Sequence, residues 1–180
     1  MEIYKKNLRL LTKNHIYSNE MEHDACGVGL IASTEGKKSR NVVEYGIEAL
    51  KAVWHRGAVD ADGKTGDGAG IHVEIPKDFF IEKIEVTGHD YDNSEICVGM
   101  IFLPRNDYSS QETCKTIIES ELTKNNFSIY GWRQVPVNPK VLGEKAFQTM
   151  PEIIQVLFKS NNPELLNKDL ERKIYETRRI

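Results

Sequence analysis

The sequence predicts a globular domain of the α+β class, in which strands and amphipathic helices follow each other along the chain. Its 180 residues are 39% hydrophobic and 28% charged, which is the composition of a folded domain with a core. Short apolar runs closed by Gly or Pro predict strands. Apolar residues spaced three to four apart behind capping residues predict helices.

Residues 1–25 form a polar leader without the apolar run of about 7 to 15 residues that a secretory signal needs. A buried strand is predicted to begin at Cys26 or Gly27, where the small apolar sequence CGVGLIAS follows the leader. The sequence Glu35-Gly36-Lys37 then predicts a turn, which ends this first strand region.

The next predicted element is a helix. Asn41 is expected to cap its start, with Glu44 three residues later as its capping-box partner. The apolar face of this helix consists of Val42, Val43, Ile47, Leu50 and Trp54. We expect the helix to run through His55 and Arg56 and to stop at Gly57, because glycine is a common residue just after a helix end.

Residues 58–70, AVDADGKTGDGAG, have no hydrophobic period and predict a loop. Ile71, Val73 and Ile75 alternate with polar residues, which predicts a half-buried strand after this loop. The continuous apolar run at 96–103 ends before a proline and predicts a further, buried strand.

Helix and strand alternate in the rest of the chain as well. Ser109 and Glu112 predict the start of a helix whose apolar face consists of Cys114, Ile117, Ile118 and Leu122. Residues 127–137 and 153–158 predict strands. Asn162 and Pro163 predict the start of a last helix, which carries Leu166, Leu170 and Ile174. Since no Gly or Pro closes that helix, we expect the domain to continue beyond residue 180.

Charge and cysteine content exclude several classes of function. The net charge of −3, with Lys and Arg scattered, argues against a nucleic-acid partner. The absence of a window of about 18 apolar residues argues against a membrane span. Three cysteines without a CxxC or Cys/His spacing argue against a disulfide framework and a zinc site. We therefore expect a reducing compartment, the cytoplasm, and no bound metal.

Cys26 is the first candidate for chemistry, because it stands at the junction between the polar leader and the apolar segment. Once it is a chain terminus, such a residue has a thiol of pKa about 8.5 and an α-amine of pKa about 7.7 to 8.0. The amine is then a general base for its own thiol. The alternative is that Cys26 is a small core residue.

Two further motifs have ordinary structural interpretations when they are taken alone. His55-Arg56-Gly57 fits a helix end, where a cation faces the negative end of the dipole and glycine follows. TGDGAG at 65–70 is neither a Walker A loop nor a GxGxxG motif, and it fits a tight turn that approaches a neighbouring backbone.

In combination these motifs are far more specific, and they resemble the amidotransferase domain of the glutamate synthase large-subunit family. The matching segments are DACGVG at 24–29, ALKAVWHRGA at 49–58, DGKTGDGAG at 62–70, IPKDFF at 75–80, GMIFLPR at 99–105 and YGWRQVPVN at 130–138. The resemblance implies a class II glutamine amidotransferase, a member of the N-terminal-nucleophile hydrolases. Their fold is a four-layer αββα sandwich with antiparallel sheets, of which residues 26–180 are the first part.

The resemblance also implies roles for single residues. Cys26 is the nucleophile, and residues 1–25 are a propeptide that is removed. Arg56 and Gly57 belong to the wall of the glutamine site, with Arg56 holding the terminal cysteine region. HRGA and GDGAG are two halves of one motif separated by an insert, and Asp67 and Gly68 are a supporting loop near the site. The oxyanion hole and the glutamine clamp lie beyond residue 180, so the fragment alone is expected to be inactive.

The implied reaction is hydrolysis of the side-chain amide of L-glutamine through a thioester. The ammonia aminates 2-oxoglutarate in a synthase region of the same polypeptide, which bears FMN and an iron–sulfur cluster and has a small reductase subunit as partner. No cofactor is expected on this fragment. Three alternatives stay open: another class II amidotransferase, which the insert argues against, a nucleotide- or flavin-binding module built on TGDGAG, and a non-catalytic interaction domain.

Overall fold

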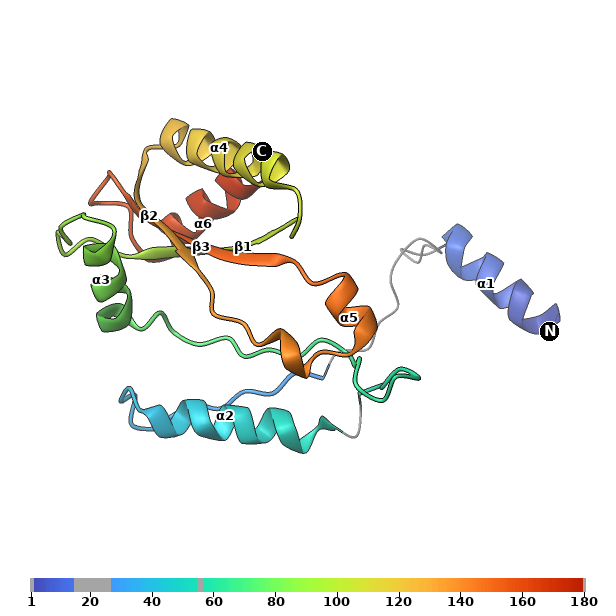
Figure 1. The fold of residues 1–180 in the computed structure, drawn as a ribbon. Coiled ribbons are helices and arrows are strands. Elements are labelled where there is room, and N and C mark those ends of the chain that lie inside the picture. The colour runs from blue at the N-terminus through green and yellow to red at the C-terminus, as the bar shows by residue number, and fades with distance from the viewer. Residues whose placement is uncertain (1, 15–26, 55–56, 180) are drawn as a thin grey trace. The chain divides into compact units, whose positions relative to one another are not determined.

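A computed structural model of the chain describes residues 2–14, 27–54 and 57–179, in two compact units, residues 1–56 and 57–180. The first unit contains α1 (Glu2–Asn14) and α2 (Arg40–Ala52). The elements of the second unit are α3 (Lys77–Val86), β1 (Cys97–Leu103), α4 (Tyr108–Lys124), β2 (Phe127–Gln134), the 3₁₀ turn η2 (Pro139–Val141), α5 (Glu144–Gln148), β3 (Glu152–Ser160) and α6 (Asn167–Arg178) (Figure 1). Among the described helices, none is long and apolar enough to span a membrane.

The first unit confirms one predicted helix and adds another. α2 is the helix predicted after the first turn, but its N-cap is Ser39 and not Asn41. The backbone N–H of Asn41 donates to Ser39 Oγ at 3.2 Å, which satisfies one of the free donors of the first turn. α2 ends at Ala52, earlier than predicted, and the His55 and Arg56 of the predicted helix end lie outside the described residues. α1 lies within the polar leader, for which the sequence had predicted no helix.

The predictions of strands at about 26–33 and at 71–75 are wrong, because the described residues of both segments form no strand. Residues 27–33 are irregular, and Val28 and Leu30 are 94% and 88% exposed. Residues 71–75 are irregular as well. A strand exists only when a neighbour takes up its backbone hydrogen bonds, and neither segment pairs with a neighbour within the described ranges.

The three later strands are confirmed and form one sheet with the order β1-β3-β2. β3 pairs antiparallel with both neighbours, so β1 and β2 run in the same direction and α4 forms the crossover between them. The antiparallel pairing agrees with the predicted α+β class. The described residues contain this one sheet, and the four-layer αββα sandwich therefore stays a prediction.

Helices cover both faces of this sheet. Because successive residues of a strand point to opposite faces, Val156 and Leu157 of β3 belong to different core clusters. Val156 packs in a cluster with Leu122 of α4 and Leu170 of α6, whereas Leu157 packs in a cluster with Ile84 of α3. Both faces of β3 are thus buried, and the strand forms the centre of the second unit.

The starts of α4 and α6 differ from the predicted ones. Asp107, not Ser109, is the N-cap of α4, and its carboxylate accepts hydrogen bonds from the N–H of Ser110 at 3.0 Å and from Ser110 Oγ at 2.6 Å. Asn162 does not start α6. Its side chain accepts a hydrogen bond from the N–H of Glu164 at 3.0 Å, which forms a turn before the helix begins at Asn167.

Candidate functional site

The predicted site residues fall into two groups. Cys26 and Arg56 lie outside the described residues, as does His55. Gly57, Asp67 and Gly68 are described, and all three belong to residues 57–68, which we call the site hairpin. The site can therefore be built up from this hairpin.

The site hairpin folds back on itself through backbone hydrogen bonds. Val59 and Gly66 form an isolated antiparallel bridge, and the N–H of Asp60 donates to the carbonyl of Thr65 at 2.7 Å. The turn at its tip places Gly63 at φ 67°, a conformation that favours glycine. The predicted loop is thus a short hairpin, and the insert between HRGA and GDGAG forms most of it.

Asp67 joins the two halves of the motif. Its Oδ2 accepts a hydrogen bond from the N–H of Ala58 at 2.9 Å, and its own N–H donates to the carbonyl of Ala58 at 3.2 Å. A Cβ at Gly66 would lie 3.3 Å from that same carbonyl, so glycine allows the close approach. Ala58 directly follows Gly57. Asp67 therefore holds the backbone next to the predicted glutamine-site wall, whereas Gly68 has open space around its Cα.

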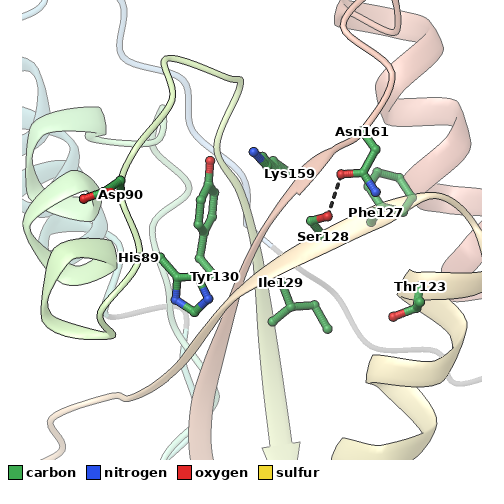
Figure 2. A pocket seen from close by; sticks show the side chains of 9 residues that line it. All are labelled: His89, Asp90, Thr123, Phe127, Ser128, Ile129, Tyr130, Lys159 and Asn161. Carbon is green, nitrogen blue, oxygen red and sulfur yellow. Dashed lines mark hydrogen bonds between the residues drawn. The ribbon is translucent and has the colours of Figure 1, made fainter.

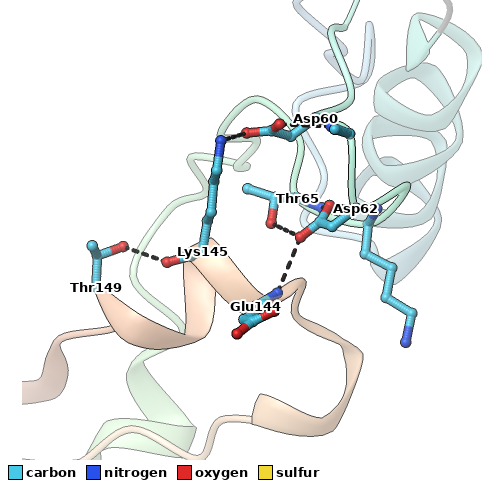
Figure 3. A network of polar contacts seen from close by, with 8 residues as sticks. Asp60, Asp62, Thr65, Glu144, Lys145 and Thr149 are labelled. Carbon is cyan, nitrogen blue, oxygen red and sulfur yellow. Dashed lines mark hydrogen bonds and ion pairs between the residues drawn. The ribbon is translucent and has the colours of Figure 1, made fainter.

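Asp62 is the centre of a polar network at the tip of the hairpin, shown in Figure 3. Its Oδ1 accepts hydrogen bonds from the N–H of Lys64 at 2.9 Å and of Thr65 at 2.7 Å. Its Oδ2 accepts from Thr65 Oγ1 at 2.6 Å and from the N–H of Glu144 at 3.1 Å. The hydrogen bonds from Thr65 are the largest cause that holds the pKa of Asp62 well below its ordinary value. Asp62 is therefore a carboxylate at neutral pH.

The network connects the hairpin to α5. Lys145 Nζ of α5 forms an ion pair with Asp60 Oδ2 at 2.5 Å, beside the bond from Glu144 to Asp62. Sequence reasoning missed this contact. The spacing of Asp62 and Thr65 is typical of a side-chain turn, but no local signal predicts a partner 82 residues away.

The hairpin does not have the geometry of a phosphate-binding loop. In such a loop a glycine-rich turn leads directly into the N-terminus of a helix, whose free N–H groups bind the phosphate. Here residues 67–76 are irregular, and α3 begins only at Lys77. The nucleotide-binding alternative for TGDGAG therefore has no support in the second unit.

A hollow of about 520 Å³ lies elsewhere in the second unit, and none of the residues that line it belongs to the site hairpin (Figure 2). Four of its polar side chains have hydrogen-bond or ion-pair partners. Ser128 Oγ donates to Asn161 Oδ1 at 2.5 Å. Tyr130 Oη donates to Asp92 at 2.9 Å, and Lys159 forms an ion pair with the same carboxylate, which lowers the pKa of Asp92. The two contacts with Asp92 connect β2 and β3 to the loop before β1.

Of the two described cysteines, Cys97 is unsuited to attack a substrate. Cys97 is buried, and burial raises the pKa of its thiol to about 12, so almost none of it is thiolate at neutral pH. Cys114 is half-buried on α4. Among the described residues no three His, Cys, Asp or Glu side chains are grouped in a way that could hold a metal ion.

The chain is similar to glutamate synthases of several organisms. It is 52% identical over 176 residues to the large chain of the NADPH glutamate synthase of Azospirillum brasilense, covering 98% of this chain and 12% of that protein. It is 38% identical to the ferredoxin-dependent glutamate synthase of Pyropia yezoensis, and the match covers 97% of this chain and 11% of that protein. It is 40% identical to ferredoxin-dependent glutamate synthase 1, chloroplastic/mitochondrial, of Arabidopsis thaliana, and the match covers 88% of this chain and 10% of that protein. The chain thus spans about a tenth of the length of these relatives.

Residues 26–180 match the family described as glutamine amidotransferases class-II. The match begins at the cysteine that the sequence predicts to be the nucleophile, and it covers the site hairpin and the whole three-stranded sheet. The resemblance inferred from the motifs is confirmed: the chain belongs to the class II glutamine amidotransferases, a family of enzymes.

Proposed function

We propose that residues 26–180 are the first part of the glutaminase domain of a glutamate synthase, with Cys26 as its nucleophile. The observation that carries the proposal is the site hairpin, in which Asp67 binds the backbone of Ala58 and joins the two halves of the motif HRGA…GDGAG. The family match that begins at Cys26 gives independent support. Residues 1–25 are then a propeptide whose removal creates the terminal cysteine.

The proposed reaction uses the two groups of a terminal cysteine. The Cys26 thiol passes its proton to its own α-amine, and the thiolate attacks the side-chain carbonyl carbon of L-glutamine. The protonated amine gives the proton to the leaving nitrogen, which departs as ammonia and leaves a thioester. Water then attacks the thioester, a proton returns to sulfur, and glutamate is released. The net change is glutamine plus water to glutamate plus ammonia.

The second half of the proposed function concerns the rest of the polypeptide. Ammonia passes to a synthase region that aminates 2-oxoglutarate and that bears FMN and an iron–sulfur cluster, with a small reductase subunit as electron-supplying partner. The described side chains do not fit a cluster, because no three His, Cys, Asp or Glu residues among them come together. Cysteine usage favours a cytoplasmic location.

The experiment that tests this proposal is N-terminal sequencing and intact-mass measurement of the active full-length enzyme. The active chain is expected to begin at Cys26, since the nitrogen of Cys26 is a non-basic amide as long as Ala25 is bonded to it. A variant in which cleavage is blocked should fold, but a glutamine-like electrophile should not label its Cys26. Full glutaminase turnover from a homogeneous preparation that retains residues 1–25 would contradict the terminal-amine mechanism.

Covalent labelling tests the identity of the nucleophile separately. A glutamine-like electrophile is expected to label Cys26 alone in the processed full-length enzyme. Cys97 is the internal control, because its buried thiol is almost fully protonated at neutral pH. Peptide mapping that finds the label on Cys97 or Cys114, with Cys26 free, would overturn the assignment.

A further inference from the structure

We infer that Asp62 is a positioning residue of the glutamine site, which holds the site hairpin against residues 143–145 and so supports Gly57 at the base of the hairpin. This inference rests on the proposed function. It assigns a role to the insert between HRGA and GDGAG, which the resemblance alone leaves without one.

The contact at the tip is specific, because one carboxylate serves both sides of it. Three of the four hydrogen bonds that Asp62 accepts come from Lys64 and Thr65 and shape the turn. The fourth comes from the N–H of Glu144, in the first turn of α5 (Figure 3). A carboxylate has enough lone pairs to accept all four bonds, whereas an amide side chain has one acceptor oxygen only.

Gly143 provides an independent observation that the contact is close. A Cβ built at this position would overlap with Thr65 Oγ1, with the backbone N of Thr65 and with the Asp62 carboxylate. Gly143 has an ordinary extended backbone, so conformational freedom does not require glycine here. The space taken by the hairpin tip does require it.

The contact also connects the hairpin to the sheet. α5 leads into β3 after a few residues, and its Phe147 ring lies 4.7 Å from the guanidinium of Arg105, which follows β1. At the other end of the hairpin, Asp67 binds the N–H of Ala58 at 2.9 Å. A hairpin fixed at its tip and closed at its base holds Gly57 in a defined position relative to the sheet.

The experiment measures glutaminase kinetics of Asp62→Ala and Asp62→Asn in the full-length enzyme. Asp62→Ala is expected to raise KM for glutamine about tenfold with kcat changed less than about twofold, since it loosens a wall that binds substrate and transition state alike. Asp62→Asn keeps an acceptor for the Lys64 and Thr65 amides but presents an NH₂ group to Glu144, so a rise of about threefold in KM is expected.

Asp92→Asn is the matched control. Asp92 is also an aspartate with several hydrogen bonds and a lowered pKa in the second unit, but its partners are Tyr130, Ser94 and Lys159. Its substitution should lower the melting temperature and leave KM for glutamine unchanged. A wild-type KM in Asp62→Ala, or an equal rise in Asp92→Asn, would overturn the positioning role.

A second measurement does not depend on glutaminase activity. Lys64 is an exposed trypsin site at the hairpin tip, and both Asp62 variants are expected to be cleaved there several times faster than the wild type, because cleavage requires local opening. Equal cleavage rates would contradict the structural part of the inference. An inactive, correctly processed wild type would instead contradict the proposed function, so the two failures can be told apart.

Discussion

The three-stranded sheet and the site hairpin are both antiparallel pairings within the second unit, but different forces hold them. In the sheet, Leu157 is 0% exposed and packs between α3 and its neighbouring strands. In the hairpin, Val59 is 55% exposed, and the contacts are hydrogen bonds from N–H groups to the carboxylates of Asp62 and Asp67. Burial of apolar area stabilises the sheet, whereas a few charge-assisted bonds fix the shape of the hairpin.

Because of this difference, substitutions in the sheet and in the site hairpin should affect different properties of the protein. Removing apolar volume from the sheet lowers the free energy of unfolding of the whole unit, because interiors are close-packed and do not refill a cavity. Removing a carboxylate from the exposed hairpin changes the position of a few backbone atoms. We therefore expect sheet substitutions to act on stability and hairpin substitutions to act on glutamine binding.

The largest expected effect is in the sheet. Leu157→Ala should lower the free energy of unfolding by about 2 to 5 kcal/mol, because it leaves a cavity at a fully buried position. Met100→Ala in β1, which is 49% exposed, is the control and should change it by less than about 0.5 kcal/mol. Chemical denaturation of the full-length enzyme, monitored by a probe in this domain, measures both. Equal effects would mean that the sheet is not the core of the unit.

The next effect is kinetic. Arg56→Lys in the full-length enzyme is expected to lower glutaminase kcat/KM at least about tenfold, since a compact ammonium cannot reproduce the planar donor fork of a guanidinium. If Arg56 were only a cation near a helix end, it would contribute about 0.3 to 1 kcal/mol of stability and nothing to turnover. Unchanged kinetics with a slightly lower melting temperature would support that simpler role.

A smaller effect is expected at the base of the hairpin. Asp67→Ala removes the acceptor of the Ala58 N–H and should lower kcat/KM about fivefold, with the melting temperature changed by less than about 2 °C, because the site is exposed. Asp67→Asn keeps one acceptor oxygen and should remain close to the wild type. A loss of stability without a kinetic change would mean that Asp67, like the residues of the sheet, contributes to stability and not to the glutamine site.

The smallest expected effect is the protonation of Asp62 at low pH. The pKa of Asp62 is lowered in the folded state below the unfolded value of about 3.9, so its contribution is complete above that pH and is lost as the pH falls through the folded pKa. The amide NMR signals of Lys64 and Thr65 should therefore stay nearly constant from pH 5 to about pH 3 and shift only at lower pH. Asp62→Asn should abolish the shift at the hairpin. Asp92 and Asp107 also have a lowered pKa. If the Lys64 and Thr65 signals shifted in the same way in Asp62→Asn, the titrating group would be one of these two aspartates and not Asp62.

Elements with a buried face could be predicted well from the sequence. The apolar run at 96–103 and the run at 153–158 became β1 and β3, because each is long enough to pair and apolar enough to be covered on both faces. α2 and α4 were predicted from their periodicity. Their caps were placed two residues too late, since Ser39 and Asp107 were not recognised as the first available acceptors.

Elements that depend on a distant partner could not be predicted. Residues 27–33 and 71–75 have the composition or alternation of strands, yet they are irregular because no described segment pairs with them. α3 was missed since its hydrophobic residues Phe79, Phe80, Ile81 and Ile84 do not form a clean helical stripe. The Asp62 network was missed because its other half lies at the start of α5.

The sequence by itself determined the family and the proposed chemistry, because the order and composition of DACGVG, WHRGA and TGDGAG carry that information without any geometry. It also determined which segments are apolar enough to form the sheet. Only the tertiary structure decided that Asp67 closes the hairpin onto Ala58 and that Asp62 meets Glu144. Such contacts depend on where packing brings two separate segments, and local residue preferences carry no information on a separation of 82 residues.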